Sequence, residues 1–223
     1  MSKRRVLELF YDVVSPYSWL GFEVMCRYKD IWNVDVKLCP GFLGGIMQAS
    51  GNKPPAMVPK KGQYMTQDLG RMAEFYQVPL KQPSDFFEVV IKKGSLSAMR
   101  FITAIQISHP EFLEPVSREL WMRIWSEDKD ITEPQSILEA AKKAGMPEDE
   151  AKKALAAISS PEIKEKLKQA TERALEYGVF GMPAVVAHIN DKPQLYFGSD
   201  RFELLAHQLG EKWLGPVPQK SRL

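Results

Sequence analysis

The stretch that decides the fold is Val6-Leu-Glu-Leu-Phe-Tyr-Asp12, which runs into Ser15-Pro-Tyr-Ser18. Its apolar first part predicts a buried β-strand that ends near Asp12. A helix then begins, because Pro16 is tolerated in the first turn of a helix but not in its interior. Ser15 therefore lies at or near the N-cap, beside free backbone N–H groups and the positive end of the helix dipole. Such a place favours an anion.

A thiolate needs such a stabilising environment, because an ordinary cysteine thiol, with a pKa of about 8.5, is only slightly ionised at neutral pH. A charge-assisted hydrogen bond contributes roughly 1.5 to 3 kcal/mol, and one pKa unit corresponds to about 1.36 kcal/mol. One hydroxyl and a helix dipole would thus lower the pKa of a bound thiol by about one to two units. An isolated serine before proline is, however, more often only a helix cap.

The protein supplies no thiol at this site. Ser15 and Ser18 have the spacing of the two cysteines of a disulfide oxidoreductase, but neither can form or attack a disulfide. If the site handles a thiolate, the sulfur must therefore arrive on a ligand, and the commonest soluble thiol is glutathione.

A second segment, Tyr177-Gly-Val-Phe-Gly-Met-Pro183, precedes an apolar strand that ends near His188. Proline at the first residue of a strand predicts a special turn, with a cis peptide bond between Met182 and Pro183. In such a turn the N–H and C=O of Met182 can point outward and pair with an extended, peptide-like ligand. Taken alone, an ordinary proline at a strand start fits the segment equally well.

A third polar cluster follows a short strand at residues 195–197. Ser199 and the first N–H groups of the next helix would hold a carboxylate, whereas Asp200 would hold an ammonium group. The γ-glutamyl end of glutathione carries both charges. Asp200 and Glu203 also have the spacing of a capping box, so a plain N-cap explains Asp200 as well.

Long motifs are spread over the chain: SPYSWLG at 15–21, SGNKPP at 50–55, SLSAMRF at 95–101, ITEPQSI at 131–137, FGMPAVVAH at 180–188, FGSDR at 197–201 and ELLAHQLGEKW at 203–213. With these motifs the sequence closely resembles the kappa-class glutathione transferases, the mitochondrial and peroxisomal type, over essentially its whole length. The resemblance implies an α/β fold in which a thioredoxin-like domain is interrupted by a large all-helical insertion. Residues 1–58 and 178–223 would form the thioredoxin-like domain, and residues 59–177 the insertion.

The resemblance also implies a binding site for glutathione as co-substrate, with Ser15 as the catalytic residue that stabilises its thiolate, and with no metal. The implied glutathione contacts are Ser15, Pro16 and Tyr17; Asn52 and Lys61 near the glycyl end; Met182, through its backbone, and Pro183; and Ser199, Asp200 and Arg201 at the γ-glutamyl end. It further implies a homodimer.

Residues 59–177 have helical periodicity almost throughout. Thr66 predicts a helix start, Thr132 and Gln135 predict a capping box, and Ser160 before Pro161 predicts another helix start. Their methionine and aromatic stripes, among them Met65, Met72, Met99 and Trp121, are interpreted as core, so the sequence assigns no wall of an electrophile pocket.

Composition limits the function further. The chain has 223 residues, 44% of them hydrophobic, and a formal net charge of +2, which gives no reason to expect binding to nucleic acid or to a membrane surface. No apolar run approaches the roughly 18 residues of a membrane span. Cys26 and Cys39 lack metal-ligand spacing, and they are predicted to be buried small side chains in a reducing compartment.

The last three residues, Ser221-Arg-Leu223, resemble the terminal Ser-Lys-Leu signal of peroxisomal proteins. The resemblance to the kappa class adds the mitochondrial matrix as a second expected location.

The sequence thus favours an enzyme that activates glutathione and transfers it to small apolar electrophiles such as halogenated nitroarenes, with reduction of organic hydroperoxides by the same thiolate. One alternative is a glutathione-dependent isomerase, similar to the bacterial hydroxychromene-carboxylate isomerases, which would not consume glutathione. Another is a non-enzymatic organellar chaperone or adaptor that binds extended peptide in a groove beside Pro183.

Overall fold

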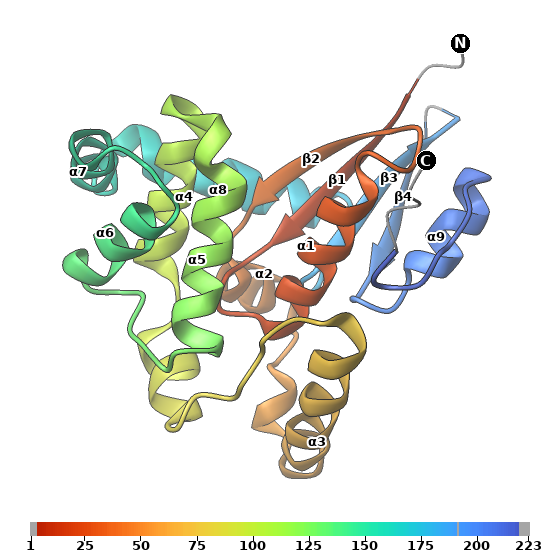
Figure 1. The fold of residues 1–223 in the computed structure, drawn as a ribbon, viewed down its shortest axis with the longest axis horizontal. Helices are drawn as coiled ribbons and strands as arrows, with labels where there is room; N and C mark the ends of the chain where they lie inside the picture. Colours follow the sequence, from red (N-terminus) through yellow and green to blue (C-terminus); the bar gives the residue numbers. More distant parts are fainter. Residues whose placement is uncertain (1–3, 191, 219–223) are drawn as a thin grey trace.

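A computed structural model describes residues 4–190 and 192–218 and shows a mixed sheet flanked by helices (Figure 1). Its strands are β1 (Arg5–Tyr11), β2 (Val34–Pro40), β3 (Ala184–Ile189) and β4 (Lys192–Phe197), in the spatial order β2-β1-β3-β4. β1 pairs parallel with β2, whereas β3 pairs antiparallel with both β1 and β4. A βαβ unit followed by a ββα unit is the arrangement expected of a thioredoxin-like domain.

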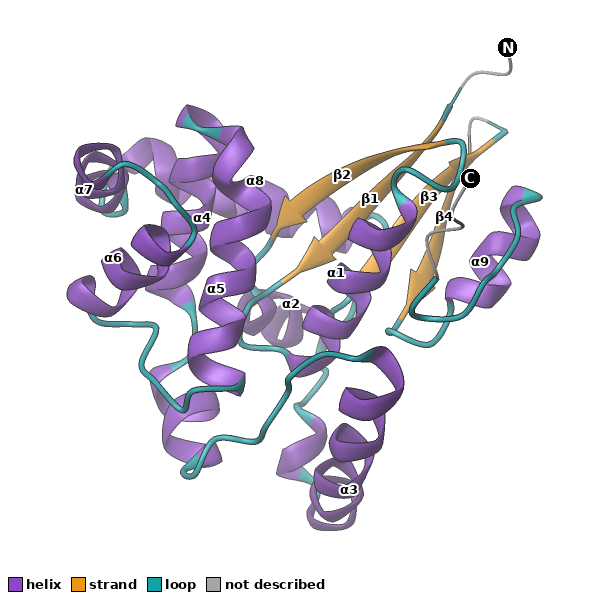
Figure 2. Ribbon diagram, viewed as in Figure 1, coloured by secondary structure: helices purple, strands orange, loops and turns teal. Residues whose placement is uncertain are grey.

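Helices make up most of the rest of the described chain (Figure 2). They are α1 (Pro16–Tyr28), α2 (Leu43–Ser50), α3 (Pro59–Tyr76), α4 (Leu96–Ser108), α5 (Leu113–Trp125), α6 (Pro134–Lys143), α7 (Glu148–Ala157), α8 (Pro161–Glu176) and α9 (Phe202–Leu209). Two 3₁₀ turns (Pro55–Met57 and Pro110–Phe112) and a π-helical segment (Phe87–Lys93) complete them. Between α2 and β3 the chain contains no strand, as expected of an all-helical interruption.

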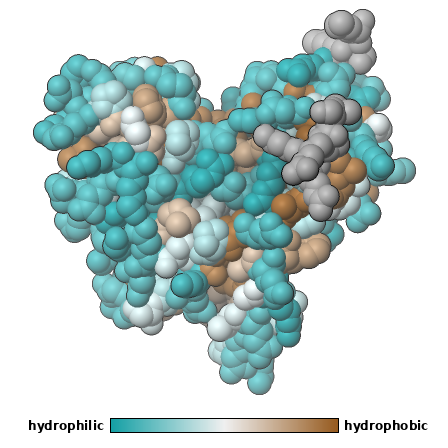
Figure 3. Space-filling model, viewed as in Figure 1, coloured by the Kyte–Doolittle hydropathy of each residue, from teal (hydrophilic) through white to brown (hydrophobic). Residues whose placement is uncertain are grey.

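The helices of this interruption stand in two places (Figure 1). α4, α5, α6, α7 and α8 gather on one side of the sheet, whereas α3 stands apart below α1. In the space-filling view of the same face, hydrophobic side chains collect toward the middle and hydrophilic ones cover the outer helices (Figure 3). α3 therefore lies next to the start of α1 and apart from the other helices of this segment.

Two of the predicted helix starts are confirmed. Ser15 caps α1, since its Oγ accepts a hydrogen bond from the Ser18 N–H at 3.1 Å. Ser160 caps α8 in the same way, by accepting from the Ile163 N–H at 3.3 Å. In both helices a proline follows the cap at the first helical position, as the sequence pattern requires.

Two other predicted starts are wrong. α3 begins at Pro59, so Thr66 lies inside the helix, where its hydroxyl donates to the Gly62 carbonyl at 3.2 Å. Thr132 makes no capping box, because the Asp130 carboxylate accepts both its N–H, at 2.6 Å, and its hydroxyl. α6 therefore begins at Pro134, which presets the first helical dihedral.

The core next to α1 is aromatic. The rings of Tyr11 and Phe22 lie 5.4 and 4.8 Å from that of Trp121, and all three side chains are fully buried. Burying a large apolar side chain contributes about 1.5–3 kcal/mol, so this cluster holds α1 and α5 together firmly. The prediction of Met99 and Trp121 as core is confirmed.

Both cysteines are free. Cys39 is buried as predicted, whereas Cys26 is only partly so. Burial raises the pKa of both thiols, to about 12 for Cys39, so each is held in its neutral form.

The C-terminal Ser221-Arg222-Leu223 lies outside the described residues. Within residues 4–190 and 192–218, no helix combines the length and the apolar character needed to cross a membrane.

Candidate active site

A cavity of about 740 Å³ lies where β1 runs into α1. Nine of the ten predicted contact residues line it: Ser15, Pro16, Tyr17, Asn52, Lys61, Met182, Pro183, Ser199 and Asp200. Arg201 is not among the lining residues, and its guanidinium lies 3.3 Å from the Asp200 carboxylate. The fold thus brings together residues from both ends of the chain.

Ser15 lies at the junction of three elements. Its Oγ accepts from the Ser18 N–H of α1 and donates to the Met182 carbonyl at 3.3 Å. Its own carbonyl accepts the indole N–H of Trp121, from α5, at 3.1 Å. With only 6% of its surface exposed, Ser15 presents a nearly desolvated hydroxyl at a helix N-terminus, where a negative charge is stabilised.

Asp12 lies behind Ser15 and is completely buried. Its carboxylate accepts hydrogen bonds at 2.9 Å from the Val14 N–H, from the Leu43 N–H at the start of α2, and from the Ser95 hydroxyl before α4. Burial raises the pKa of this carboxyl to about 6, against the opposing effect of the three donors. The sequence analysis did not assign this residue to the site.

The Met182–Pro183 peptide bond is cis, as predicted. The Pro183 carbonyl accepts the Gly198 N–H at 2.9 Å, and the neighbouring Phe180 carbonyl accepts the Asn52 side-chain amide at 2.8 Å. The N–H of Met182 forms no hydrogen bond within residues 4–190 and 192–218. A ligand in the cavity with a carbonyl group would find this donor unpaired.

Ser199 and Asp200 occupy the turn between β4 and α9. Gly198 has φ +101°, and a Cβ there would lie 2.8 Å from the Asp200 carboxylate, so the turn requires glycine. The predicted capping box is wrong: α9 begins at Phe202 with no side-chain cap, because the Asp200 carboxylate folds back over Gly198.

Tyr17 meets α3 across the cavity. Its hydroxyl donates to Asp68 at 3.4 Å, and the Tyr64 hydroxyl donates to the same carboxylate at 3.1 Å. Burial and the Asp68 charge raise the pKa of Tyr17 to about 12, so its hydroxyl stays protonated. Tyr17 is thereby held as a neutral wall beside Ser15.

One face of α3 forms a wall of the cavity, of which the sequence analysis predicted only Lys61. Lys61, Met65, Asp68 and Met72 all line the cavity and follow one another at intervals of four, three and four residues. Met65 and Met72, interpreted as core, therefore belong to the cavity wall as well. The helical interval was a usable signal, but periodicity shows only that a face is covered, not by what.

The cavity has polar and apolar parts. Its apolar lining includes Val14, Met47, Phe86, Val90 and Ile91, the last two from the π-helical segment. The cations Lys53 and Lys61 come from the loop before α3 and from α3, whereas the carboxylate of Asp200 comes from the β4–α9 turn. Among the described residues no cluster of histidine, cysteine, aspartate or glutamate could hold a metal ion.

The chain is similar to known proteins over most of its length. A DsbA-like thioredoxin domain model matches residues 6–210. Glutathione S-transferase kappa 1 of Homo sapiens is 57% identical and that of Rattus norvegicus 58%, each over 96% of this chain and 95% of the relative. A solved structure of 2-hydroxychromene-2-carboxylate isomerase superposes with a TM-score of 0.73 at 21% identity, over 92% of this chain and 94% of that one, which shows a shared fold.

The thioredoxin-like architecture, Ser15 at a helix N-terminus and the relatives at more than half identity agree. The chain belongs to the kappa-class glutathione S-transferases.

Proposed function

We propose that this enzyme binds glutathione in the cavity beside Ser15, stabilises its thiolate there and transfers it to small apolar electrophiles such as halogenated nitroarenes. The observation that carries the proposal is the position of the Ser15 hydroxyl, which lines the cavity, is nearly buried, caps α1 and donates to the Met182 carbonyl. A thiolate beside it would accept the same proton in a charge-assisted hydrogen bond.

The surrounding residues suit the rest of glutathione. The Met182 N–H would pair with the cysteinyl backbone, Asn52 and Lys61 would hold the glycyl carboxylate, and Ser199 and Asp200 would hold the γ-glutamyl end. Pro16 and Tyr17 would pack beside the thiolate, and Arg201 would act through Asp200.

Conjugation follows from positioning. The thiol proton leaves to solvent, the sulfur forms a bond to the carbon that bears the halogen, and the electron pair of the breaking bond leaves with the halide. The apolar lining at Met65, Met72 and Val90 offers a place for an aromatic ring next to the polar part of the cavity. Reduction of an organic hydroperoxide would start from the same thiolate: the sulfur bonds to the terminal peroxide oxygen, the O–O bond breaks and the alcohol leaves. A second glutathione then reduces the resulting sulfenic acid, giving glutathione disulfide and water.

The test is to incubate the enzyme with glutathione and a chlorodinitrobenzene and to quantify free thiol, released chloride and thioether product. The proposal expects one thiol lost and one chloride released per thioether formed, and a large loss of turnover in Ser15→Ala. The isomerase alternative expects catalysis on a cyclic hydroxy acid without loss of thiol. The adaptor alternative expects peptide binding that Ser15→Ala leaves intact.

We also propose that the enzyme is a homodimer. Sedimentation equilibrium would then give twice the 25.4 kDa mass of the chain. A species at 25.4 kDa over the micromolar range would refute this.

A further inference from the structure

Tyr76, the last residue of α3, lies outside the cavity and contacts Ser199, which lines it. Its side chain is buried, with 4% of its surface exposed, and its hydroxyl donates to the Ser199 carbonyl at 2.7 Å. Burial and the nearby Asp200 charge raise the pKa of Tyr76 to about 12, so the phenol keeps its proton through the working range. It is a permanent donor to the backbone of the β4–α9 turn.

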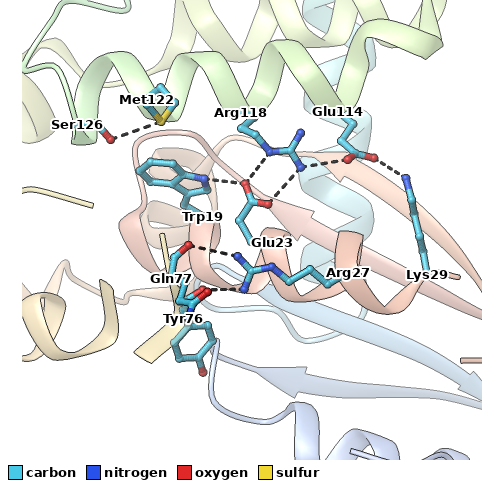
Figure 4. A network of polar contacts seen from close by, with 10 residues as sticks. All are labelled: Trp19, Glu23, Arg27, Lys29, Tyr76, Gln77, Glu114, Arg118, Met122 and Ser126. Carbon is cyan, nitrogen blue, oxygen red and sulfur yellow. Dashed lines mark hydrogen bonds and ion pairs between the residues drawn. The ribbon is translucent and has the colours of Figure 1, made fainter. Parts of the chain in front are cut away.

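The base of Tyr76 is fixed as well. Arg27, in the last turn of α1, donates to the Tyr76 carbonyl at 2.7 Å (Figure 4). It also donates to the Pro216 carbonyl at 2.9 Å. The next residue, Gln77, ends α3 in the left-handed region at φ 50°. The left-handed backbone conformation of Gln77 has some energetic cost for an L-residue. The Arg27 hydrogen bond stabilises this end of α3 and connects it to α1.

α1 is itself braced against α5. The Glu23 carboxylate accepts the Trp19 indole N–H at 3.0 Å and the Arg118 guanidinium N–H at 2.8 Å. Figure 4 shows it between these two side chains. Ser15 caps the start of α1, and Arg27, which positions Tyr76, lies twelve residues later in the same helix. The two residues are thus held by one braced helix.

We propose that Tyr76 is a positioning residue for the amino-acid end of glutathione: by holding the Ser199 carbonyl it sets where the Ser199–Asp200 turn presents its groups to the cavity. The inference rests on the proposed function and deepens it. Tyr76 is not among the residues that line the cavity, so it acts through Ser199. No other side chain in the described part of the chain donates to that carbonyl.

Tyr76→Phe tests the inference, because it removes only the hydroxyl. The buried Ser199 carbonyl loses its donor, so we expect the KM for glutathione to rise about tenfold. The kcat and the pKa of the bound thiol should stay at their wild-type values, because Ser15 and α1 are untouched. A role in stability alone would leave KM unchanged.

Tyr28→Phe is the control. The Tyr28 hydroxyl also belongs to a buried side chain and donates to a backbone carbonyl, that of Gly215 at 2.7 Å; it accepts the Leu214 N–H at 2.8 Å as well, so its loss should cost at least as much stability. Tyr28 does not line the cavity. We expect this variant to lose thermal stability while its KM for glutathione stays at the wild-type value.

A second readout works even where a variant is partly unfolded. The ratio of kcat/KM for glutathione to kcat/KM for cysteinylglycine, which lacks the γ-glutamyl residue, is independent of the folded fraction. We expect this ratio to fall about tenfold in Tyr76→Phe and not at all in Tyr28→Phe. If the wild type turns over glutathione and the ratio in Tyr76→Phe equals the wild-type ratio, the inference about Tyr76 is overturned and the proposed function stands. If the wild type itself does not turn over glutathione, the proposed function is overturned.

Discussion

Replacing Ser15 with alanine should raise the pKa of bound glutathione. In the structure the Ser15 hydroxyl donates to the Met182 carbonyl at 3.3 Å, well beyond the usual 2.7–2.8 Å for an O–H···O bond. A bond this long is weak, so the proton would move readily to a thiolate. Its charge-assisted bond contributes about 1.5–3 kcal/mol, which corresponds to a pKa lower by about one to two units.

The alanine variant keeps α1, its free N–H groups and its dipole. These contribute about 0.3–1 kcal/mol, less than one pKa unit. We therefore expect the pKa of the bound thiol to rise by about one to two units and still to lie slightly below that of free glutathione. At pH 6.5 the thiolate fraction should fall about tenfold or more, and the deficit in turnover should shrink as pH rises above the thiol pKa.

The assay is the ultraviolet absorbance of bound thiolate, titrated from about pH 5 to about pH 10 under saturating glutathione. Ser18→Ala is the matched control. The Ser18 hydroxyl is buried and has no hydrogen-bond partner among the described residues, and the backbone N–H of residue 18, which bonds to Ser15, is retained. A bound-thiol pKa in Ser15→Ala equal to that of the wild type, or an equal rise in Ser18→Ala, would refute the reasoning.

Three further outcomes are expected. Because the folded pKa of Asp12, about 6, lies above its ordinary 3.8, the buried carboxyl favours folding below pH 4, and this contribution is lost as pH rises through 6. Denaturant titrations at pH 4 and pH 7 should therefore show Asp12→Asn gaining about 2 kcal/mol relative to wild type over that interval. Cys39, whose thiol pKa is raised to about 12 by burial, should resist iodoacetamide at pH 7.5 until the protein unfolds, as read by intact-protein mass spectrometry. Gly198→Ala should lower glutathione affinity in calorimetry and destabilise the fold by about 1 kcal/mol or more, because φ is +101° and the new Cβ meets the Asp200 carboxylate; unchanged binding would contradict this role of the turn.

Local signals in the sequence predicted the parts of the site that depend on local backbone geometry. Ser15 before Pro16 predicted a capped helix start, and Pro183 before an apolar run predicted the cis turn; both are confirmed. Each depends on restrictions that proline imposes on its own and the preceding residue, and these restrictions do not depend on the rest of the fold. The same reasoning failed at Thr132, where a closer acceptor, Asp130, competes for the hydroxyl.

The remaining parts depend on pairs that are distant in the chain. The Asp12 carboxylate meets the Ser95 hydroxyl 83 residues later, and the Tyr76 hydroxyl meets the Ser199 carbonyl 123 residues later. In neither pair does the local sequence around one residue predict its hydrogen-bond partner. A buried aspartate at a strand end and a tyrosine at a helix end are each explained by several environments, and only the assembled fold selects one.

The structure also shows how α3, which lies apart from the sheet, contributes to the site in two ways. Its cavity face carries Lys61, Met65, Asp68 and Met72, and its last residue, Tyr76, anchors the β4–α9 turn. Arg27 fixes that end of α3 to α1, so a shift of α3 would disturb the Ser199 turn and the apolar wall together. Binding of the thiol and binding of the electrophile would then be coupled through one helix, and a variant that loosens α3, such as Arg27→Met, should weaken both.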